Sequence, residues 1–181
     1  MPGLTALTGT PGTGKSSVAA RLAARWRMCE VAELALDLRA GRRRGRTVEV
    51  DLPRLRARIR ARRRLPDVDV LVGHLAHLLP VRDVIVLRCH PVELARRLRR
   101  ARRGAAADRR ENFLAEATDV VLREALGPGR RVWEVDTTGR TVADVAREVD
   151  RRLRRRGRSS YGTVDWLGDP RVTAHLLDRP R

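Results

Sequence analysis

Residues 9–16, G-T-P-G-T-G-K-S, have the residue types and spacing of a phosphate-binding loop and fit the pattern G-x-x-x-x-G-K-[S/T] without a mismatch. Glycines allow backbone N–H groups to close around phosphate oxygens. Lys15 carries an ammonium for the β- and γ-phosphates, and Ser16 carries a hydroxyl for Mg²⁺. The positive end of a following helix would face the same anion. The residues predicted to bind the nucleotide are Gly12, Thr13, Gly14, Lys15, Ser16 and Ser17.

The elements that must position this loop are present on both sides of it. Residues 4–7, L-T-A-L, are typical of a short buried strand. After the loop, apolar residues recur at the three- and four-residue steps of one helix face, at Val18, Ala19, Leu22, Ala23 and Trp26. Lys15 is also the only lysine among 40 basic residues. An ammonium is more compact than a guanidinium, and this favours a phosphate cradle over a chance glycine turn.

Length and composition indicate a folded, strongly basic chain. Its 181 residues suit one domain with small inserted lids, and 42% of them are hydrophobic. The net charge of +18 favours polyanionic partners such as nucleotides or RNA. Two interpretations stay open, a functional proximity to RNA or the ribosome and a compositional drift towards arginine. The aromatic content of 3% argues against a surface that stacks the bases of single-stranded nucleic acid.

The cysteines, the first residues of the chain and its longest apolar stretch indicate the cellular compartment. Cys29 and Cys89 do not form a C-x-x-C pair, so we expect free thiols in a reducing compartment and no metal knuckle. We expect no signal peptide, because no basic segment precedes the first strand. The longest apolar stretch, residues 68–87, is interrupted by charged residues and proline and cannot span a membrane. We therefore expect a cytoplasmic protein with no membrane partner.

Five strand-like segments alternate with helical patterns, which predicts an α/β fold. The strands are expected at residues 4–7, 28–31, 68–72, 84–87 and 132–135. Helices are expected over 32–38 and 52–64, from Pro91 to a break at 102–108, over 111–125, and from 141 or 144 to about 155. Residues 40–46 are expected to form a polar loop, either solvated or in contact with phosphate or RNA, and residues 47–51 an edge strand or turn. The tail from residue 157 is expected to dock in part through Tyr161 and Trp166.

Polar residues follow three of these strands, and ligands of open parallel sheets bind outside such carboxyl ends. His74 follows the third strand and could orient a phosphate or water, or be structural, whereas we expect His77 to be structural. An acid that supports Mg²⁺ is expected at the end of this strand, but Val72 occupies the position and Asp69 comes too early. Asp37 or Asp51 could supply the acid instead. Position selects Arg88, at the end of the fourth strand, and Arg102 or Arg103, in the predicted break, as arginines for the transferred phosphoryl group.

Beyond the phosphate-binding loop, the sequence resembles the archaeal branch of the adenylate kinase isoenzyme 6 family. Members of this family are atypical adenylate kinases and ATPases that are also assembly factors of the small ribosomal subunit. The resemblance covers essentially the whole chain and rests on residues 6–16, 73–80, 86–89, 94, 97–98, 111–112, 116–117, 135–140 and 161–167. The chain departs from the family at Val72, where Asp or Glu is usual. It departs again at Leu36, near a common arginine, where Arg39 could substitute.

The resemblance implies a P-loop NTPase of the nucleoside-monophosphate-kinase type, with three α/β/α layers and a five-stranded parallel sheet. A core over residues 1–156 would contain a monophosphate-binding region near 32–51 and a short lid near 99–110. Residues 157–181 would form the tail.

The resemblance also implies the reaction ATP + AMP ⇌ 2 ADP with Mg²⁺, ATPase activity, and small-subunit ribosomal protein and rRNA as partners. The expected catalytic residues are Lys15, His74, Arg88 and Arg103. Arg103 would also contact ATP, and Ser16 would be the Mg²⁺ ligand. Two alternatives stay open: an ATPase switch in ribosome assembly with negligible kinase activity, and a P-loop kinase of another small substrate.

Overall fold

The computed structural model describes residues 4–45, 47–62, 65, 67–102, 104–155 and 157–177. At its centre lies a five-stranded sheet with the order β2-β5-β1-β6-β7, in which all neighbours are parallel. The predicted parallel sheet is thus confirmed. Its strands are β1 (Thr5–Thr8), β2 (Met28–Glu30), β5 (Val70–Val72), β6 (Asp83–Arg88) and β7 (Arg131–Asp136).

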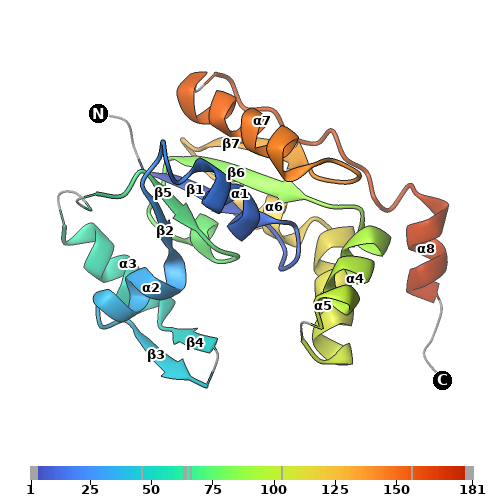
Figure 1. The fold of residues 1–181 in the computed structure, drawn as a ribbon, viewed down its shortest axis with the longest axis horizontal. Helices are drawn as coiled ribbons and strands as arrows, with labels where there is room; N and C mark the ends of the chain where they lie inside the picture. Colours follow the sequence, from blue (N-terminus) through green and yellow to red (C-terminus); the bar gives the residue numbers. More distant parts are fainter. Residues whose placement is uncertain are drawn as a thin grey trace.

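Helices cover both faces of this sheet, which is why its strands are rich in Val, Leu and Ile (Figure 1). One face packs against α1 (Lys15–Leu22) and α7 (Val142–Arg155), with Trp133 fully buried between them and the sheet. The opposite core is formed with α2 (Val31–Asp37), α3 (Leu52–Arg60), α6 (Val120–Ala125) and the 3₁₀ turn η1 (Ala76–Leu78). The three-layer α/β/α prediction is therefore confirmed.

Two arms extend to the same side of the sheet, one on each side of the phosphate-binding loop (Figure 1). The first arm consists of α2, the antiparallel pair β3 (Gly41–Arg44) and β4 (Thr47–Val50), and α3. The second arm consists of α4 (Pro91–Arg100) and α5 (Ala106–Ala117), which pack against each other. The first arm overlaps the predicted monophosphate-binding region, residues 32–51, and the second arm overlaps the predicted lid, residues 99–110, and both arms extend beyond these bounds.

Several predicted elements differ from the structure. The polar loop expected over residues 40–46 is instead the strand β3 and a turn, because β3 pairs with the alternating strand β4. Arg46 lies outside the described residues. The helix expected over 111–125 is divided into α5 and α6 at Asp119, whose φ of 58° is left-handed and incompatible with a continuous helix. In addition, α3 ends at Arg60, before the expected residue 64.

The tail lies against the second arm and the edge of the sheet. Ser160 pairs with Trp133 next to β7, and α8 (Pro170–Leu177) packs beside α4. Val172 of α8 is fully buried against Phe113 and Ala117. Of the tail, Tyr161 is about half exposed, whereas the indole N–H of Trp166 donates to Glu116.

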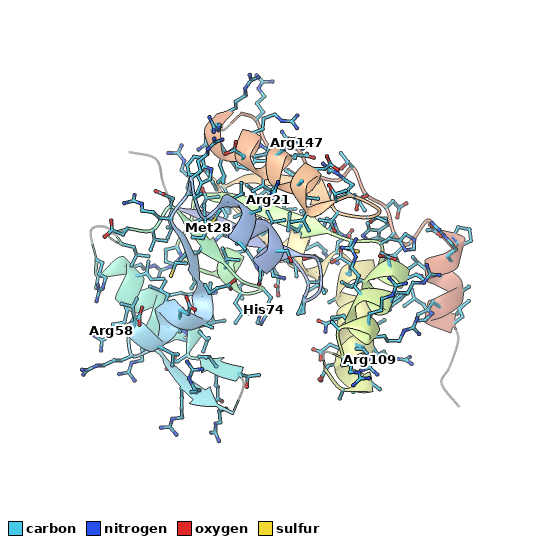
Figure 2. The ribbon with its side chains drawn as sticks, in the orientation of Figure 1. Arg21, Met28, Arg58, His74, Arg109 and Arg147 are labelled. Carbon is cyan, nitrogen blue, oxygen red and sulfur yellow. The ribbon has the colours of Figure 1, made fainter. Side chains whose placement is uncertain are left out.

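Arginines dominate the outer surface of the helices. Arg21, Arg58 and Arg147 are exposed, and Figure 2 shows them on three different helices. None of the helices in the described part of the chain has the length and apolar character needed to cross a membrane.

Candidate active site

The phosphate-binding loop is held close to β6 and α4. Gly9 and Gly12 have φ angles of 141° and 96°, which L side chains rarely adopt. A Cβ atom on Gly9 would lie 2.3 Å from the carbonyl oxygen of Leu87, and one on Gly12 would lie 2.8 Å from Cδ1 of Leu94. Glycine is therefore required at both positions by backbone conformation and by packing.

Lys15 begins α1, and its ammonium group lies within the curve of the loop. Its Nζ atom donates to the carbonyl oxygen of Gly9 at 2.7 Å and to that of Thr10 at 3.0 Å. The Thr13 hydroxyl also donates to the Thr10 carbonyl, at 2.9 Å. The loop thus holds a single positive charge in a defined place before any phosphate arrives.

Glu30 is the carboxylate next to Ser16, and the sequence analysis did not select it. The Ser16 hydroxyl donates to Oε1 of Glu30 at 3.3 Å. Burial raises the pKa of Glu30, while the hydrogen bond from Ser16 opposes the rise. Glu30 lies at the end of β2, one strand away from the position where an acid was expected, and only the pairing of β2 with β5 brings it to this place.

The acids proposed for this position from the sequence are engaged elsewhere or lie at the surface. Asp51 caps α3 by accepting a hydrogen bond from the backbone N–H of Arg54 at 3.0 Å. Asp37 is exposed in the last turn of α2. The expectation that Asp37 or Asp51 supports Ser16 is therefore wrong.

Two cavities meet at the phosphate-binding loop. The first, about 370 Å³, is bordered by Lys15, Ser16, Glu30, His74 and Arg97 among others. The second, about 260 Å³, lies towards β7 and α7 and is bordered by Thr137, Arg140 and Val142. Both cavities share Gly12, Gly14, Ser17 and Arg97. An elongated ligand with phosphates at the loop could therefore occupy both. A larger cavity of about 580 Å³ lies away from the loop, between α4, α5 and α8.

The two histidines after β5 have different environments. His74 is exposed at the mouth of the first cavity, between the two arms (Figure 2). Partial desolvation of the imidazole, and then the charge of Lys15, lower the pKa of His74. His77 is buried, with Nδ1 2.9 Å from the Thr8 hydroxyl and Nε2 2.9 Å from Glu124. His77 is thus a structural residue, whereas His74 can contact a ligand.

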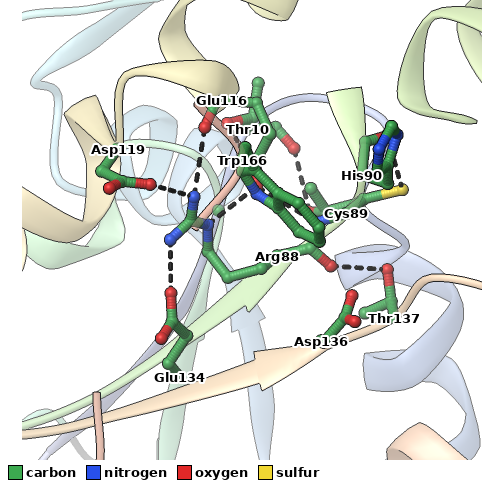
Figure 3. Close-up of polar contacts among 12 residues, drawn as sticks. Thr10, Arg88, Cys89, His90, Glu116, Asp119, Glu134, Asp136, Thr137 and Trp166 are labelled. Atoms are coloured by element: carbon green, nitrogen blue, oxygen red, sulfur yellow. Dashed lines mark hydrogen bonds and ion pairs between the residues drawn. The ribbon is translucent and has the colours of Figure 1, made fainter. Parts of the chain in front are cut away.

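Arg88 does not border either cavity. Its guanidinium is buried and makes ion pairs with three carboxylates, those of Glu116, Asp119 and Glu134 (Figure 3). Burial alone would lower the pKa of Arg88, but the charges of Glu116 and Asp119 and the hydrogen bonds to them raise it above its ordinary value. The expectation that Arg88 clamps a transferred phosphoryl group is therefore wrong, because every side of the guanidinium is already occupied within the fold.

Arg97 of α4 takes the position that was expected for Arg88. It borders both cavities, and its Nη2 atom donates to the carbonyl oxygen of Thr137 at 3.0 Å. Its Nε atom donates to Glu93 at 3.3 Å. Arg103, the other predicted clamp, lies outside the described residues, and Arg102 is exposed in the turn after α4. Arg39 is exposed after α2 and borders neither cavity.

The oxygen atoms beside the loop suit Mg²⁺. The described residues contain no cluster of three or more His, Cys, Asp or Glu side chains arranged for a metal ion. Mg²⁺ does not need one, because it keeps several waters and takes one or two protein ligands together with substrate phosphates. The Ser16 hydroxyl and the Glu30 carboxylate supply the oxygen donors that this ion prefers.

Comparison with known proteins assigns the family. A family model described as an AAA domain matches residues 6–119. A protein of Pyrococcus furiosus described as "Putative adenylate kinase" is 40% identical over 164 residues, which is 89% of each chain. Proteins with the same description from Thermococcus onnurineus and Archaeoglobus fulgidus are 39% and 40% identical and cover 94% and 92% of this chain, and 96% and 93% of their own.

The chain belongs to this adenylate-kinase-like family. Solved structures agree on the fold: a shikimate kinase from Bacteroides thetaiotaomicron, 15% identical, covers 83% of this chain and 97% of its own with a TM-score of 0.53. A gluconokinase from Sinorhizobium meliloti, 20% identical, covers 85% and 93% with a TM-score of 0.51. Family and fold together make this adenylate-kinase-like protein a P-loop kinase.

The contrast between the two arginines can be tested by substitution. Replacing Arg88 with Met leaves three carboxylates without their cation, so we expect a loss of about 3–5 kcal/mol in the free energy of unfolding. Replacing Arg97 with Gln should change stability by less than about 0.5 kcal/mol. The Arg97 variant should instead weaken ATP binding roughly tenfold, the scale of one charged hydrogen bond.

Urea denaturation and isothermal titration calorimetry measure the two effects. Arg96→Gln is the matched control, since Arg96 is exposed on the same helix and borders neither cavity. Normal stability of Arg88→Met, or unchanged ATP affinity of Arg97→Gln, would contradict these assignments.

Proposed function

We propose that the protein is an adenylate kinase, which transfers the γ-phosphoryl group of ATP to AMP and forms two ADP. The observation that carries this proposal is the pair of cavities that meet at Gly12, Gly14 and Arg97. The second cavity would hold the adenosine of ATP beside Thr137 and Arg140. The first would hold the transferred phosphoryl group and open, past His74, towards the arm that would bind AMP. The description of the archaeal relatives supports adenine as the base at both sites.

The residues would act by positioning and by charge stabilisation, as expected for phosphoryl transfer. Lys15 and the loop amides would hold the β- and γ-phosphates, and Ser16 would hold Mg²⁺. When bound, this ion neutralises charge that develops on the phosphate oxygens. Arg97 would contact the phosphates from the lid side, a role that we also propose for Arg103.

The acceptor would need no general base. An oxygen of the AMP phosphate, already ionised at neutral pH, forms the new P–O bond as the bond between the γ-phosphorus and the bridging oxygen breaks. His74 would stay neutral at pH 7, since its pKa is lowered. It could therefore hydrogen-bond to the acceptor phosphate or to a water.

A second role in maturation of the small ribosomal subunit is favoured by the arginines of the first arm. Arg42, Arg43 and Arg44 are consecutive and exposed on β3. We propose that this protein is of the isoenzyme 6 type, hydrolyses ATP in the cytoplasm, and contacts rRNA and a small-subunit ribosomal protein. The hairpin would supply the phosphate contacts, since arginines on one exposed strand can follow an RNA backbone.

The kinase proposal predicts that ADP formation depends on AMP. With ATP and Mg²⁺, adding AMP should increase ADP production at least tenfold, and Lys15→Met should lower the rate by on the order of 10²-fold, the scale for one preorganised charged donor. A coupled assay of ADP formation measures both rates. Arg151→Met is the control, because Arg151 is exposed on α7 away from the loop.

The outcome of that assay separates the competing functions. Equal turnover without AMP would support the ATPase switch and contradict the kinase proposal. Turnover that appears only with another small acceptor, such as shikimate or a nucleoside, would support a kinase of different specificity.

The RNA proposal predicts a site rather than a general effect of charge. The double variant Arg42→Ala/Arg43→Ala should weaken binding to small-subunit rRNA. It should also flatten the dependence of log Kd on log salt concentration by about one to two units. Gel-shift titrations at several salt concentrations measure this, with Arg151→Ala/Arg155→Ala on α7 as the charge-matched control. An equal loss in both double variants would indicate compositional charge alone.

A further inference from the structure

We propose that Glu30, at the end of β2, replaces the acid that β5 lacks at Val72 and anchors the Mg²⁺–ATP complex through the hydration shell of the ion. The inference rests on the proposed function only as far as ATP and Mg²⁺ bind at the loop. It does not depend on AMP as the acceptor. Glu30 would then be a positioning residue of this chain. It lies on β2, next to the strand on which the sequence pattern places the acid.

The register of the sheet brings the two positions together. β2 and β5 are parallel neighbours, and Glu30 is the direct partner of Val72. The pair two residues earlier, Met28 and Val70, packs into the core under α1. Because side chains alternate along a strand, Glu30 and Val72 face that same side, where α1 begins with Lys15 and Ser16.

The side chains differ in what they can offer an ion at this edge. Val72 is fully buried and has no polar atom in its side chain. Glu30 starts one strand farther away, about 4.8 Å across the sheet. Its additional methylene group, compared with Asp, extends its reach, and the structure places Oε1 3.3 Å from the Ser16 hydroxyl. A carboxylate in the neighbouring strand can therefore reach the serine that would bind the ion.

No other carboxylate competes for this role among the described residues that border the first cavity, since Glu30 is the single acid there. Glu33 is exposed on α2. Asp69 is engaged by Arg27, which donates to both of its carboxylate oxygens.

The test measures metal affinity directly. Mn²⁺ serves as the probe, and electron paramagnetic resonance follows its binding to the protein–ATP complex. Glu30→Gln keeps the size of the side chain and an oxygen that can accept from Ser16, but removes the charge. We expect this variant to bind Mn²⁺ about 10–100-fold more weakly, the usual effect of losing an outer-shell partner. Its affinity for ATP in EDTA should remain unchanged.

A rescue variant and a control sharpen the result. Val72→Asp in the Glu30→Gln background should restore most of the Mn²⁺ affinity, because it returns a carboxylate to the same edge. Glu33→Gln removes an exposed acid of α2 that does not border the cavity, and it should have a much smaller effect than Glu30→Gln. Thermal unfolding checks that each variant is folded. If the rescue variant does not fold, the comparison of Glu30→Gln with Glu33→Gln decides.

Two results would overturn the proposal. One is unchanged Mn²⁺ affinity in Glu30→Gln. The other is an equal loss of ATP affinity with and without metal, which would mean that Glu30 only shapes the loop. Because the measurement contains no AMP, a failed adenylate kinase assay would leave this result standing, and a failed metal test would leave the acceptor question open to its own assay.

Discussion

The buried guanidinium of Arg88 is the interaction on which the arrangement of the site depends. It joins the end of β6 to β7 through Glu134 and to α5 through Glu116, and it reaches Asp119 at the junction of α5 and α6. Glu116 also accepts a hydrogen bond from the Thr10 hydroxyl and one from the backbone N–H of Cys89 (Figure 3). A buried charge is costly unless its partners are all present. Arg88 and its carboxylate partners therefore hold the loop, α5 and the sheet together.

Two of the carboxylates that pair with Arg88, those of Glu116 and Glu134, also connect the tail to the site. The indole of Trp166 reaches Glu116 and lies edge-on to His90, and His90 in turn pairs with Asp169. The backbone N–H of Thr163 donates to Glu134. Glu116 of α5 thus contacts both the phosphate-binding loop and the tail, whereas Glu134 of β7 contacts the tail and Arg88. A displacement of α5 would therefore change the hydrogen bonds that Thr10 and the tail make to Glu116, because coupling travels through contiguous packed and polar contacts.

The features predicted most reliably from the sequence are those that depend on neighbouring residues alone. The loop over residues 9–16 and the buried strands follow from short-range patterns, and the structure has the strands within a few residues of the expected bounds. Of the hairpin β3–β4, only β4 was predicted as a possible strand. β3 was predicted as a loop, because a run of arginines has no apolar alternation. The break at Asp119 was missed because a single left-handed residue leaves the apolar pattern intact.

The site itself could be predicted only in part, for a related reason. Arg88 and Arg97 are the same residue type near the same strand end, and only the packing of α5 decides which one is buried among carboxylates. Glu30 and Ser16 are 14 residues apart and meet through the pairing of β2 with β5. Such contacts depend on sheet order, which no local pattern specifies.

We propose that one continuous site accepts two adenine nucleotides, one on either side of the phosphate-binding loop. A crystal structure with two adenosines joined by five phosphates, together with Mg²⁺, tests it most directly. We predict one adenosine beside Thr137 and Arg140, the phosphates along Lys15 and Arg97, and the second adenosine against the arm of α2, β3 and β4. A second adenosine that remains in solvent while the first is bound would contradict the account.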